Sequence, residues 1–412
     1  ASSSVRMELL RVAYRRFLNH QPELRSKLDA FQHDQAHWLH DHCMFIACKN
    51  AHEDRSWNEW DEGLVRRDSN VLNAWKEKLR VACDFEVFIQ YLFERQWQEL
   101  RSYSAENGVG IIGDIPIFVA MDSADVWAMQ HLFELDDRGA PTVVAGVPPD
   151  YFAALGQRWG NPLYRWETHK NTGYDWWIRR FKRMMQLCDL VRIDHFRGFE
   201  AYWEIPSHLP DARVGQWRPG PRDDLFHALK QTMGDELPVI AEDLGFITNE
   251  VRELRDRFRF PGMKIILFGF GGCDSRSLDL PHNYPVHCLA YTGTHDNDTV
   301  VGWFQSKAGE GNTRSEEENS AERSFALKYL NCKAEDIHKG MMRSVWSSVA
   351  AVTIAPVQDL LGLSNASRMN MPGTVAGNWT WRCEPGMLNS QVAAELLEMT
   401  QLYGREVQGR RT

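Results

Sequence analysis

Residues 189–196 read DLVRIDHF, a short apolar run that ends in charged and aromatic side chains. Its near-continuous apolar centre is typical of a strand that is buried on both faces of a sheet. Because side chains alternate along a strand, Arg192 and Asp194 point to the same side, opposite to the apolar residues that flank Arg192. We therefore expect a guanidinium and a carboxylate to lie beside each other at the carboxyl end of this strand.

Five further runs have the same texture, and each is bounded by Gly, Pro or Asp. They are VGIIGDIPIFVA (109–120), LPVIAEDLG (237–245), GMKIILFGF (262–270), VHCLAYTGTHD (286–296) and VAAVTIAPVQD (349–359). Segments with helical spacing separate them, and this alternation indicates βα units and a parallel sheet. The sequence therefore predicts an α/β protein.

The first part of the chain has a different texture. Residues 1–107 carry apolar residues at three- and four-residue spacing, as in the stretch VLNAWKEKLRVACDFEVFIQYLFERQWQELRSY, and lack short strand-like runs. We expect residues 1–107 to form a mainly helical insertion or subdomain, and residues 108–412 to form the catalytic barrel portion. Within that portion, residues 140–166 predict an aromatic loop insertion rich in Gly and Pro, and long loops of this kind are usually functional.

Composition narrows the class of protein. The 412 residues are 43% hydrophobic and 25% charged, which is typical of a folded globular chain. Lys and Arg number 47 against 56 Asp and Glu, a net charge of −9 that argues against nucleic acid as a partner. No apolar stretch is long enough to span a bilayer, so we expect no membrane partner. The eight cysteines form no C-x-x-C, which favours a reducing compartment, either the cytoplasm or a plastid.

Acidic residues recur at the carboxyl ends of the predicted strands. They are Asp114, Asp194, Glu242 and Asp296. In a parallel α/β barrel this end carries the active site, so carboxylates there are typical of catalysis. A guanidinium beside a carboxylate favours its ionised form, as a nucleophile requires, whereas a carboxyl in a more apolar setting keeps its proton and can act as an acid. Such a pair is typical of retaining glycosyl transfer.

Three of these carboxylates also have a purely structural interpretation. Asp194 could form an ion pair with Arg192 or Arg197, Asp296 could cap the following helix, and Glu242 could be solvated surface. Their joint occurrence at strand ends favours a shared site over three unrelated roles.

Several long stretches carry a family resemblance. They are VRIDHFRGFEAYWEIP (191–206), VIAEDLG (239–245), TGTHDNDT (292–299), GDIPIFVAMDSADVWA (113–128) and GVPPDYFAALGQRWGNPLYRW (146–166). Together they resemble the amylomaltase (disproportionating enzyme) family of 4-α-glucanotransferases, relatives of the α-amylase superfamily. The resemblance implies a (β/α)8 barrel of the TIM type with helical and loop insertions. Because the family's first two strands have no counterpart before residue 1, we expect the six runs to be strands three to eight.

The same resemblance implies roles for individual residues. Asp194 resembles the family's nucleophile, Glu242 its general acid/base and Asp296 its third carboxylate, while Arg192 and His295 match the residues that orient these groups. Further matches line the glucan cleft, namely Asp114, Pro116, Asn161 and Asn370. In the aromatic loop, Tyr151, Phe152 and Trp159 could cover the site and exclude water. The alternative for this loop is a small satellite core.

The resemblance implies an enzyme that transfers α-1,4-glucan segments, including malto-oligosaccharides, to the 4-hydroxyl of an acceptor sugar by a retaining double displacement. Two alternatives stay open, a retaining α-glucan hydrolase and a catalytically silent glucan-binding fragment. We expect no cofactor. We also expect no metal, because His33, His37 and His40 lie in a helical stretch and not on a barrel strand. The chain also has 16 Trp, and the flat face of Trp159 could stack on a glucose ring.

Overall fold

The computed structural model describes residues 3–20, 22–149, 155–307, 309, 315–374 and 376–406. The chain divides into two compact units, one of the described residues up to Val239 and one of those from Ile240 onward. The prediction for Tyr151 and Phe152 lies outside the described residues. Every helix in the described part of the chain is too short or too polar to traverse a membrane.

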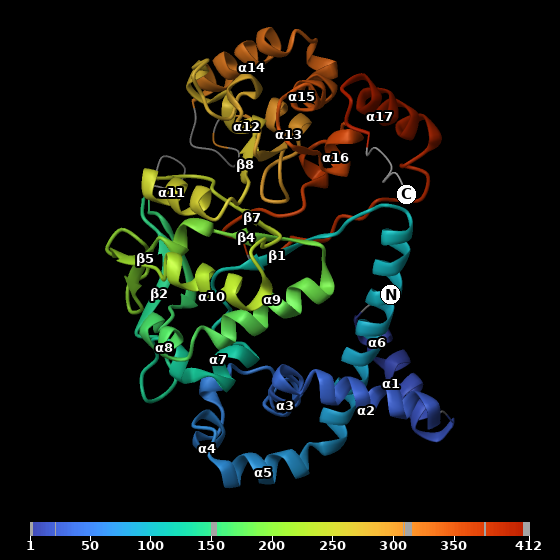
Figure 1. Cartoon of the computed structure of the whole chain (residues 1–412), viewed down its shortest axis with the longest axis vertical. Helices are drawn as coiled ribbons and strands as arrows, with labels where there is room; N and C mark the ends of the chain where they lie inside the picture. The colour runs from blue at the N-terminus through green and yellow to red at the C-terminus, as the bar shows by residue number, and fades with distance from the viewer. Residues whose placement is uncertain are drawn as a thin grey trace. The chain divides into compact units, whose positions relative to one another are not determined.

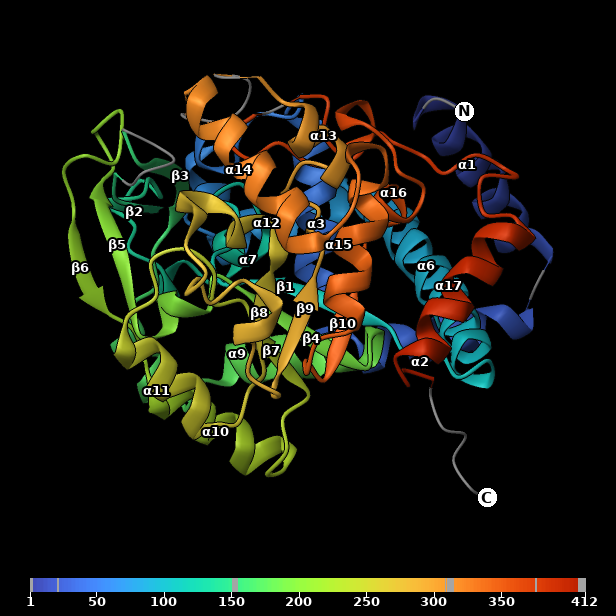
Figure 2. The ribbon, with the colours of Figure 1, turned by 90° about the horizontal axis from the view of Figure 1, so that it is seen from above.

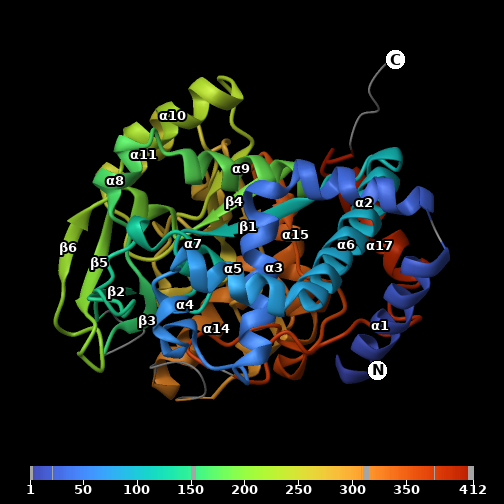
Figure 3. The same ribbon diagram turned by 90° about the horizontal axis from the view of Figure 1, so that it is seen from below.

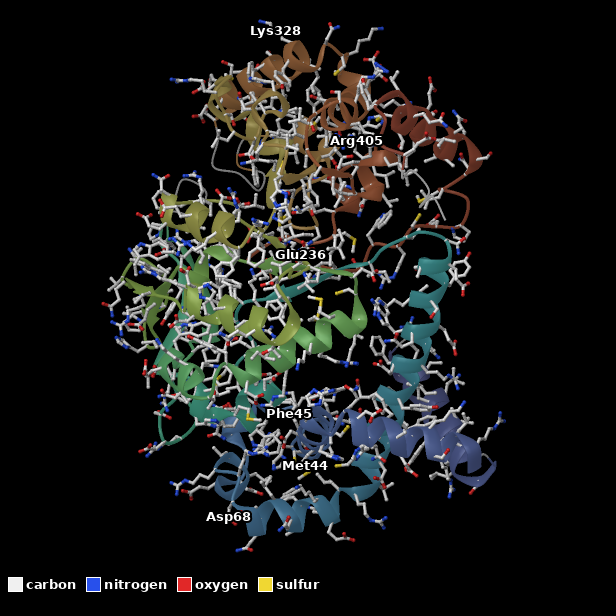
Figure 4. The ribbon with its side chains drawn as sticks, viewed as in Figure 1. Met44, Phe45, Asp68, Glu236, Lys328 and Arg405 are labelled. Carbon is white, nitrogen blue, oxygen red and sulfur yellow. The ribbon has the colours of Figure 1, made fainter. Side chains whose placement is uncertain are left out.

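The first unit begins with the predicted helical segment. Its helices are α1 (Ser3–His20), α2 (Pro22–Asp34), α3 (Ala36–Ala51), α4 (Glu62–Val65), α5 (Ser69–Lys78) and α6 (Arg80–Glu106) (Figure 1). Apolar residues at helical spacing bury one face of each long helix: Phe17 packs against Phe88, with ring centres 5.0 Å apart. Met44 and Phe45, labelled in Figure 4, are buried on α3. The boundary expected after residue 107 lies inside the first unit, so the division into residues 1–107 and 108–412 stays a prediction.

All six predicted runs form strands. Three of them make a sheet in the order β1 (Ile112–Pro116), β4 (Leu190–Asp194) and β7 (Val239–Ala241). β1 and β4 are parallel, and their register sets Asp114 opposite Arg192 and Pro116 opposite Asp194. This pairing places the polar ends of both strands at one edge of the sheet.

The other three strands make a parallel sheet in the second unit. Its order is β10 (Val352–Ile354), β9 (Cys288–Tyr291) and β8 (Gly262–Ile265), and the strands lie side by side in Figure 2. Within this unit the N–H of Ala241, the last residue of β7, donates to the carbonyl of Pro261, just before β8, at 2.9 Å. The α/β class predicted from the alternating texture is therefore confirmed.

Helices separate the parallel strands along the chain, as βα units require. In the first unit they are α7 (Ala124–Ala128), α8 (Trp166–Asn171), α9 (Asp175–Leu187) and α10 (Asp223–Met233). In the second unit they are α11 (Asn249–Arg257), α12 (Ile266–Gly269), α13 (Val300–Gln305), α14 (Glu316–Leu330) and α15 (Ile337–Trp346). After the last strand come α16 (Val357–Leu360) and α17 (Ser390–Leu402). Arg405, labelled in Figure 4, follows α17 and donates to the carbonyls of Trp346, Ser348 and Ala350, which ties the end of the described chain to the turn after α15.

A four-stranded antiparallel sheet in the first unit was not predicted. Its order is β3 (Gln157–Pro162), β2 (Val143–Val147), β5 (Ala201–Pro206) and β6 (Gln216–Pro219), seen from below in Figure 3. The aromatic loop expected at 140–166 therefore contains two strands. Gly146 lets them approach closely, because a Cβ at this position would lie 2.2 Å from the carbonyl oxygen of Gln157. Three of these strands, β3, β5 and β6, contain Pro and charged residues, so they lack the apolar pattern of the other six. β2 reads VVAGV and is apolar, but it was not predicted as a strand.

Candidate active site

The first unit presents a guanidinium that bridges two carboxylates. Arg192 on β4 donates from Nη1 to Oδ2 of Asp114 at 2.6 Å and from Nη2 to Oδ1 of Asp194 at 3.0 Å. The Arg192 side chain is 10% exposed, whereas those of Asp114 and Asp194 are 44% and 40% exposed. The register of β1 and β4 produces this bridge, because it places Asp114 opposite Arg192. The predicted pairing of Arg192 with Asp194 is confirmed, and Asp194 still faces solvent.

Directly after Asp194 the chain turns sharply. His195 has φ 51° and ψ 50°, a left-handed conformation that costs a non-glycine residue free energy and is often found at functional sites. Burial lowers the pKa of the His195 imidazole to about 3, and the Arg197 charge adds to the effect, so the ring is neutral at physiological pH. His195 was not predicted as a site residue, although its position directly after Asp194 in the sequence was a signal for it.

An aromatic face lies beside this turn. The Trp159 ring on β3 meets the His195 ring edge-on, with centres 4.8 Å apart, and is 38% exposed. Asn161, two residues further along β3, donates a hydrogen bond from its side-chain Nδ2 to the backbone carbonyl of Val119 at 2.9 Å. The structure thus brings Trp159 next to the end of β4, while Pro116 lies opposite Asp194 in the sheet register.

In the second unit, two acidic residues follow β7 and differ in burial. Glu242 is partly exposed, and its Oε1 accepts a hydrogen bond from the N–H of Leu244 at 3.1 Å. Asp243 is buried, accepts from the N–H of Met263 at 2.7 Å and pairs with Arg255. Burial raises the pKa of the Asp243 carboxyl, and the Met263 N–H and the Arg255 charge oppose that rise. Asp243 therefore ties the end of β7 to β8, whereas Glu242 is the less buried of the two carboxyl groups.

Asp296 lies in the loop between β9 and α13, and its oxygens are held by side chains from elsewhere in the second unit. Asn370 donates from Nδ2 to Oδ1 at 2.6 Å, and Arg368 donates from Nη2 to the Asp296 carbonyl at 2.6 Å. Nε2 of His295 lies 3.3 Å from Oδ2. The cap of α13 is Thr299, whose hydroxyl accepts from Gly302, so Asp296 does not cap that helix. The structure brings together the predicted residues Asp296, His295 and Asn370.

Two neighbours of this cluster were not predicted. Arg368 precedes Asn370 by two residues, and Trp379 lies with its ring centre 5.1 Å from that of His295. Trp379 is 52% exposed and has φ 60°, the left-handed region. Both residues lie in the stretch RMNMPGTVAGNW (368–379), but sequence alone does not show which of its side chains face His295 and Asp296.

Metal ligands do not gather in the part of the chain that the structure describes, where no three His, Cys, Asp or Glu side chains are placed to share an ion. His33 lies on α2, and His37 and His40 lie on α3, all in the helical segment as predicted.

The fold is similar to that of solved amylomaltase structures. An amylomaltase from Streptococcus agalactiae, solved in complex with acarbose, superposes with a TM-score of 0.91 at 38% identity, covering 98% of this chain and 79% of that one. An amylomaltase from Corynebacterium glutamicum shares the fold, with a TM-score of 0.71 at 19% identity. The chain therefore has the α/β-barrel fold of the amylomaltases, as predicted.

Sequence relatives define the family more narrowly. The profile of the 4-alpha-glucanotransferase family matches residues 1–389. A 4-alpha-glucanotransferase from Synechocystis is 46% identical over 404 residues, covering 97% of this chain and 78% of that protein. The corresponding enzyme from Thermus thermophilus is 45% identical, covering 96% and 78%, and a chloroplastic/amyloplastic one from Solanum tuberosum is 41% identical, covering 98% and 69%. The chain belongs to the 4-alpha-glucanotransferase family.

Proposed function

We propose that Asp194, Glu242 and Asp296 are the catalytic residues of the 4-alpha-glucanotransferase reaction in this chain, and that its substrate is an α-1,4-glucan. The observation that carries the proposal is the bridge from Arg192 to Asp114 and Asp194 at the end of β4. It fixes one oxygen of Asp194 and leaves the side chain 40% exposed. A carboxylate that is held beside a cation and open to solvent is suited to attack an anomeric carbon.

In the first half of the reaction Asp194 forms a bond to the anomeric carbon of the donor sugar while the glycosidic bond breaks. Glu242 gives its proton to the departing 4-oxygen, and the released segment leaves. The product of this half is a covalent glycosyl ester of Asp194. Asp296, whose carboxylate is oriented by Asn370, would bind ring hydroxyls more tightly in the oxocarbenium-like transition state than in the ground state.

In the second half Glu242, now ionised, removes the proton from the 4-hydroxyl of an acceptor sugar. That oxygen attacks the anomeric carbon and the ester bond to Asp194 breaks, so the α-linkage is restored. Transfer instead of hydrolysis requires the sugar to outcompete water. The exposed ring of Trp159 beside His195 offers an apolar face on which an acceptor or donor sugar could stack.

The substrates that we propose are α-1,4-glucans and malto-oligosaccharides, in line with the acarbose bound to the Streptococcus agalactiae amylomaltase. The location that we propose is the cytoplasm or a plastid. All eight cysteines are free, which suits a reducing compartment, and the Solanum tuberosum relative is named chloroplastic/amyloplastic.

The test is incubation of the purified chain with maltotriose, followed by chromatography of the products. Transfer yields glucose together with oligosaccharides longer than maltotriose, whereas a hydrolase yields only shorter sugars and a silent binding fragment yields none. Asp194→Asn should abolish the formation of oligosaccharides longer than maltotriose without shifting the melting temperature. Asp235→Asn is the matched control, because its side chain is 98% exposed and it should keep full activity.

A further inference from the structure

A buried carboxylate outside the proposed catalytic set joins both ends of the loop that carries Asp296. Asp359 on α16 is 1% exposed. Its Oδ2 accepts the hydroxyl of Thr292, directly after β9, at 2.6 Å, and its Oδ1 accepts the N–H of Val300, the first residue of α13, at 2.8 Å. One carboxylate therefore closes the loop of residues 293–299 at its base.

Inside the loop, hydrogen bonds between residues close in sequence connect the base of the loop to Asp296. Oδ1 of Asn297 accepts from the N–H and from the hydroxyl of Thr294, at 2.8 and 2.9 Å. The same Thr294 hydroxyl accepts from the N–H of Asp296 at 3.3 Å. With its base closed by Asp359 and its interior cross-linked, the loop has few ways to move Asp296 without breaking a hydrogen bond.

The neighbour of Asp359 restrains the second segment that binds Asp296. Gln358 is buried and donates from Nε2 to the carbonyl of Ser367 at 3.1 Å. Arg368 comes next in the chain, and both Arg368 and Asn370 donate hydrogen bonds to Asp296. Two consecutive buried residues on α16 thus fix both the loop that bears Asp296 and the segment that orients it.

The chemistry of the site favours a carboxylate at position 359. Both partners, the Thr292 hydroxyl and the Val300 N–H, are donors, and hydrogen bonds to an ionised acceptor are stronger than neutral ones. Burial raises the pKa of Asp359 to about 6, while its two hydrogen bonds oppose the rise and the charge of Asp298 adds to it. A buried charge is costly for folding, so its presence beside the Asp296 loop suggests that it serves the loop's geometry.

We propose that Asp359 is a positioning residue for the reaction, which holds Asp296 in place by closing its loop through Thr292 and Val300. The inference rests on the proposed role of Asp296. Asp359 itself touches neither substrate nor reacting atoms; it acts through the orientation of Asp296, and its loss should therefore lower kcat more than it raises KM.

The experiment is a double-mutant cycle between positions 296 and 359. Transfer from an α-maltosyl fluoride donor to maltose is measured for the unchanged chain, Asp296→Asn, Asp359→Asn and the double variant, because an activated donor keeps weak variants measurable. We expect Asp359→Asn to lower kcat roughly 10- to 100-fold on its own, as misplacement of a catalytic group by about 1 Å does. In the Asp296→Asn background the same change should lower kcat less than about threefold.

Two results would overturn the inference, and they can be told apart. An equal loss from Asp359→Asn in both backgrounds, with Asp296→Asn itself impaired, shows that Asp359 does not act through Asp296. Full activity of Asp296→Asn would instead show that Asp296 does not have its proposed role. The inference about Asp359 would then fail as well, because it depends on that role.

A pair of variants at Thr292 tests the same contact without changing the buried charge of Asp359, whose loss could also affect folding. Thr292→Val removes one donor to Asp359 at nearly constant volume, and Thr292→Ser retains it. We expect Thr292→Val to lower kcat a few-fold at unchanged KM and Thr292→Ser to restore it, because one of the two hydrogen bonds is lost and regained. Thr400→Val is the matched control, since its hydroxyl bonds only within α17, to the carbonyl of Leu396. An effect of Thr400→Val equal to that of Thr292→Val, or failure of serine to rescue, contradicts the inference.

Discussion

Arg192 and Asp194 lie two residues apart on β4 and share a hydrogen bond of 3.0 Å between Nη2 and Oδ1. The other arm of the guanidinium is occupied by Asp114, at 2.6 Å. A planar fork with fixed donor directions can serve two carboxylates at once, which a lysine ammonium at the same position cannot do with the same geometry. The orientation of Asp194 therefore depends on an arginine and not only on a positive charge.

Arg192→Lys tests this dependence. We expect kcat for transfer to fall roughly 10- to 100-fold, because the charge is kept while the orientation of Asp194 is lost. The measurement is kcat with maltotriose, alongside the melting temperature. Arg213→Lys, in the exposed pair with Asp211, is the control and should change neither. Full activity of Arg192→Lys would show that charge alone suffices.

Trp159→Ala tests the aromatic face beside His195. Loss of a stacking ring weakens binding of a sugar more than it slows the chemical step, so we expect KM for maltotriose to rise about 5- to 20-fold, by analogy with aromatic contacts worth about 1–2 kcal/mol. Trp159→Phe should recover part of the loss. Trp217→Ala is a closely matched control, because Trp217 is also 38% exposed but has Arg197 over its ring at 3.9 Å. Equal effects of the two alanine changes would contradict a specific role for Trp159.

Much of the fold could be predicted because four of its six parallel strands, β4, β7, β8 and β9, are largely buried. Burial on both faces leaves runs such as VIA (239–241) and CLAY (288–291) without charged residues, and the end of VIA then marks Glu242. In β4 the charged residues Arg192 and Asp194 alternate with buried apolar residues, and Asp194 ends the strand. Strand β6 of the antiparallel sheet could not be predicted, since it reads QWRP and every residue of it is exposed. Such a strand is specified by pairing with β5 and not by its own apolar pattern.

The sequence predicted the carboxylates of the candidate site and two of the residues beside them, Arg192 and His295, but not the hydrogen bonds that hold Asp296 from distant parts of the chain. Asn370 was expected to line the cleft, and the structure shows its amide bonded to Asp296, 74 residues earlier. Asp359 closes the predicted run VAAVTIAPVQD, yet its partner Thr292 is 67 residues away in the chain. Contacts at such separations follow from tertiary packing, and a single sequence contains no local signal for them.

Gly146→Ala tests the close approach of β2 and β3. A Cβ at Gly146 would lie 2.2 Å from a backbone oxygen of Gln157, and backbone cannot rotate away as a side chain can. We expect the free energy of unfolding to fall by about 1–3 kcal/mol, in the range of overpacking elsewhere. Thermal unfolding measures it. The nearest atom to a Cβ at Gly110 would be 3.7 Å away, so Gly110→Ala should be tolerated. Equal melting temperatures for both variants would contradict the packing argument.

The fully buried His169 predicts a pH-dependent part of the stability. Burial lowers its pKa from 6.5 to about 4. As pH falls through 6.5 the unfolded chain binds a proton that the folded chain does not bind until about pH 4, so the free energy of unfolding decreases across this window, by up to about 3 kcal/mol.

His169→Gln removes that proton and should therefore be less destabilising at pH 5 than at pH 7.5, as judged from melting temperatures at both values. His33→Gln, at an exposed position, should behave alike at both. The same destabilisation by His169→Gln at the two pH values would argue against a neutral buried imidazole.

Capture of the covalent bond that we propose between Asp194 and the donor sugar is the most direct test of the mechanism. With Glu242→Gln and an α-maltosyl fluoride donor, fluoride leaves without an acid, while the base needed to release the sugar is missing. We predict a maltosyl adduct on the peptide that contains Asp194, detected by mass spectrometry of a proteolytic digest. An adduct on another carboxylate, or release of product with inverted anomeric configuration and no adduct, would contradict the account.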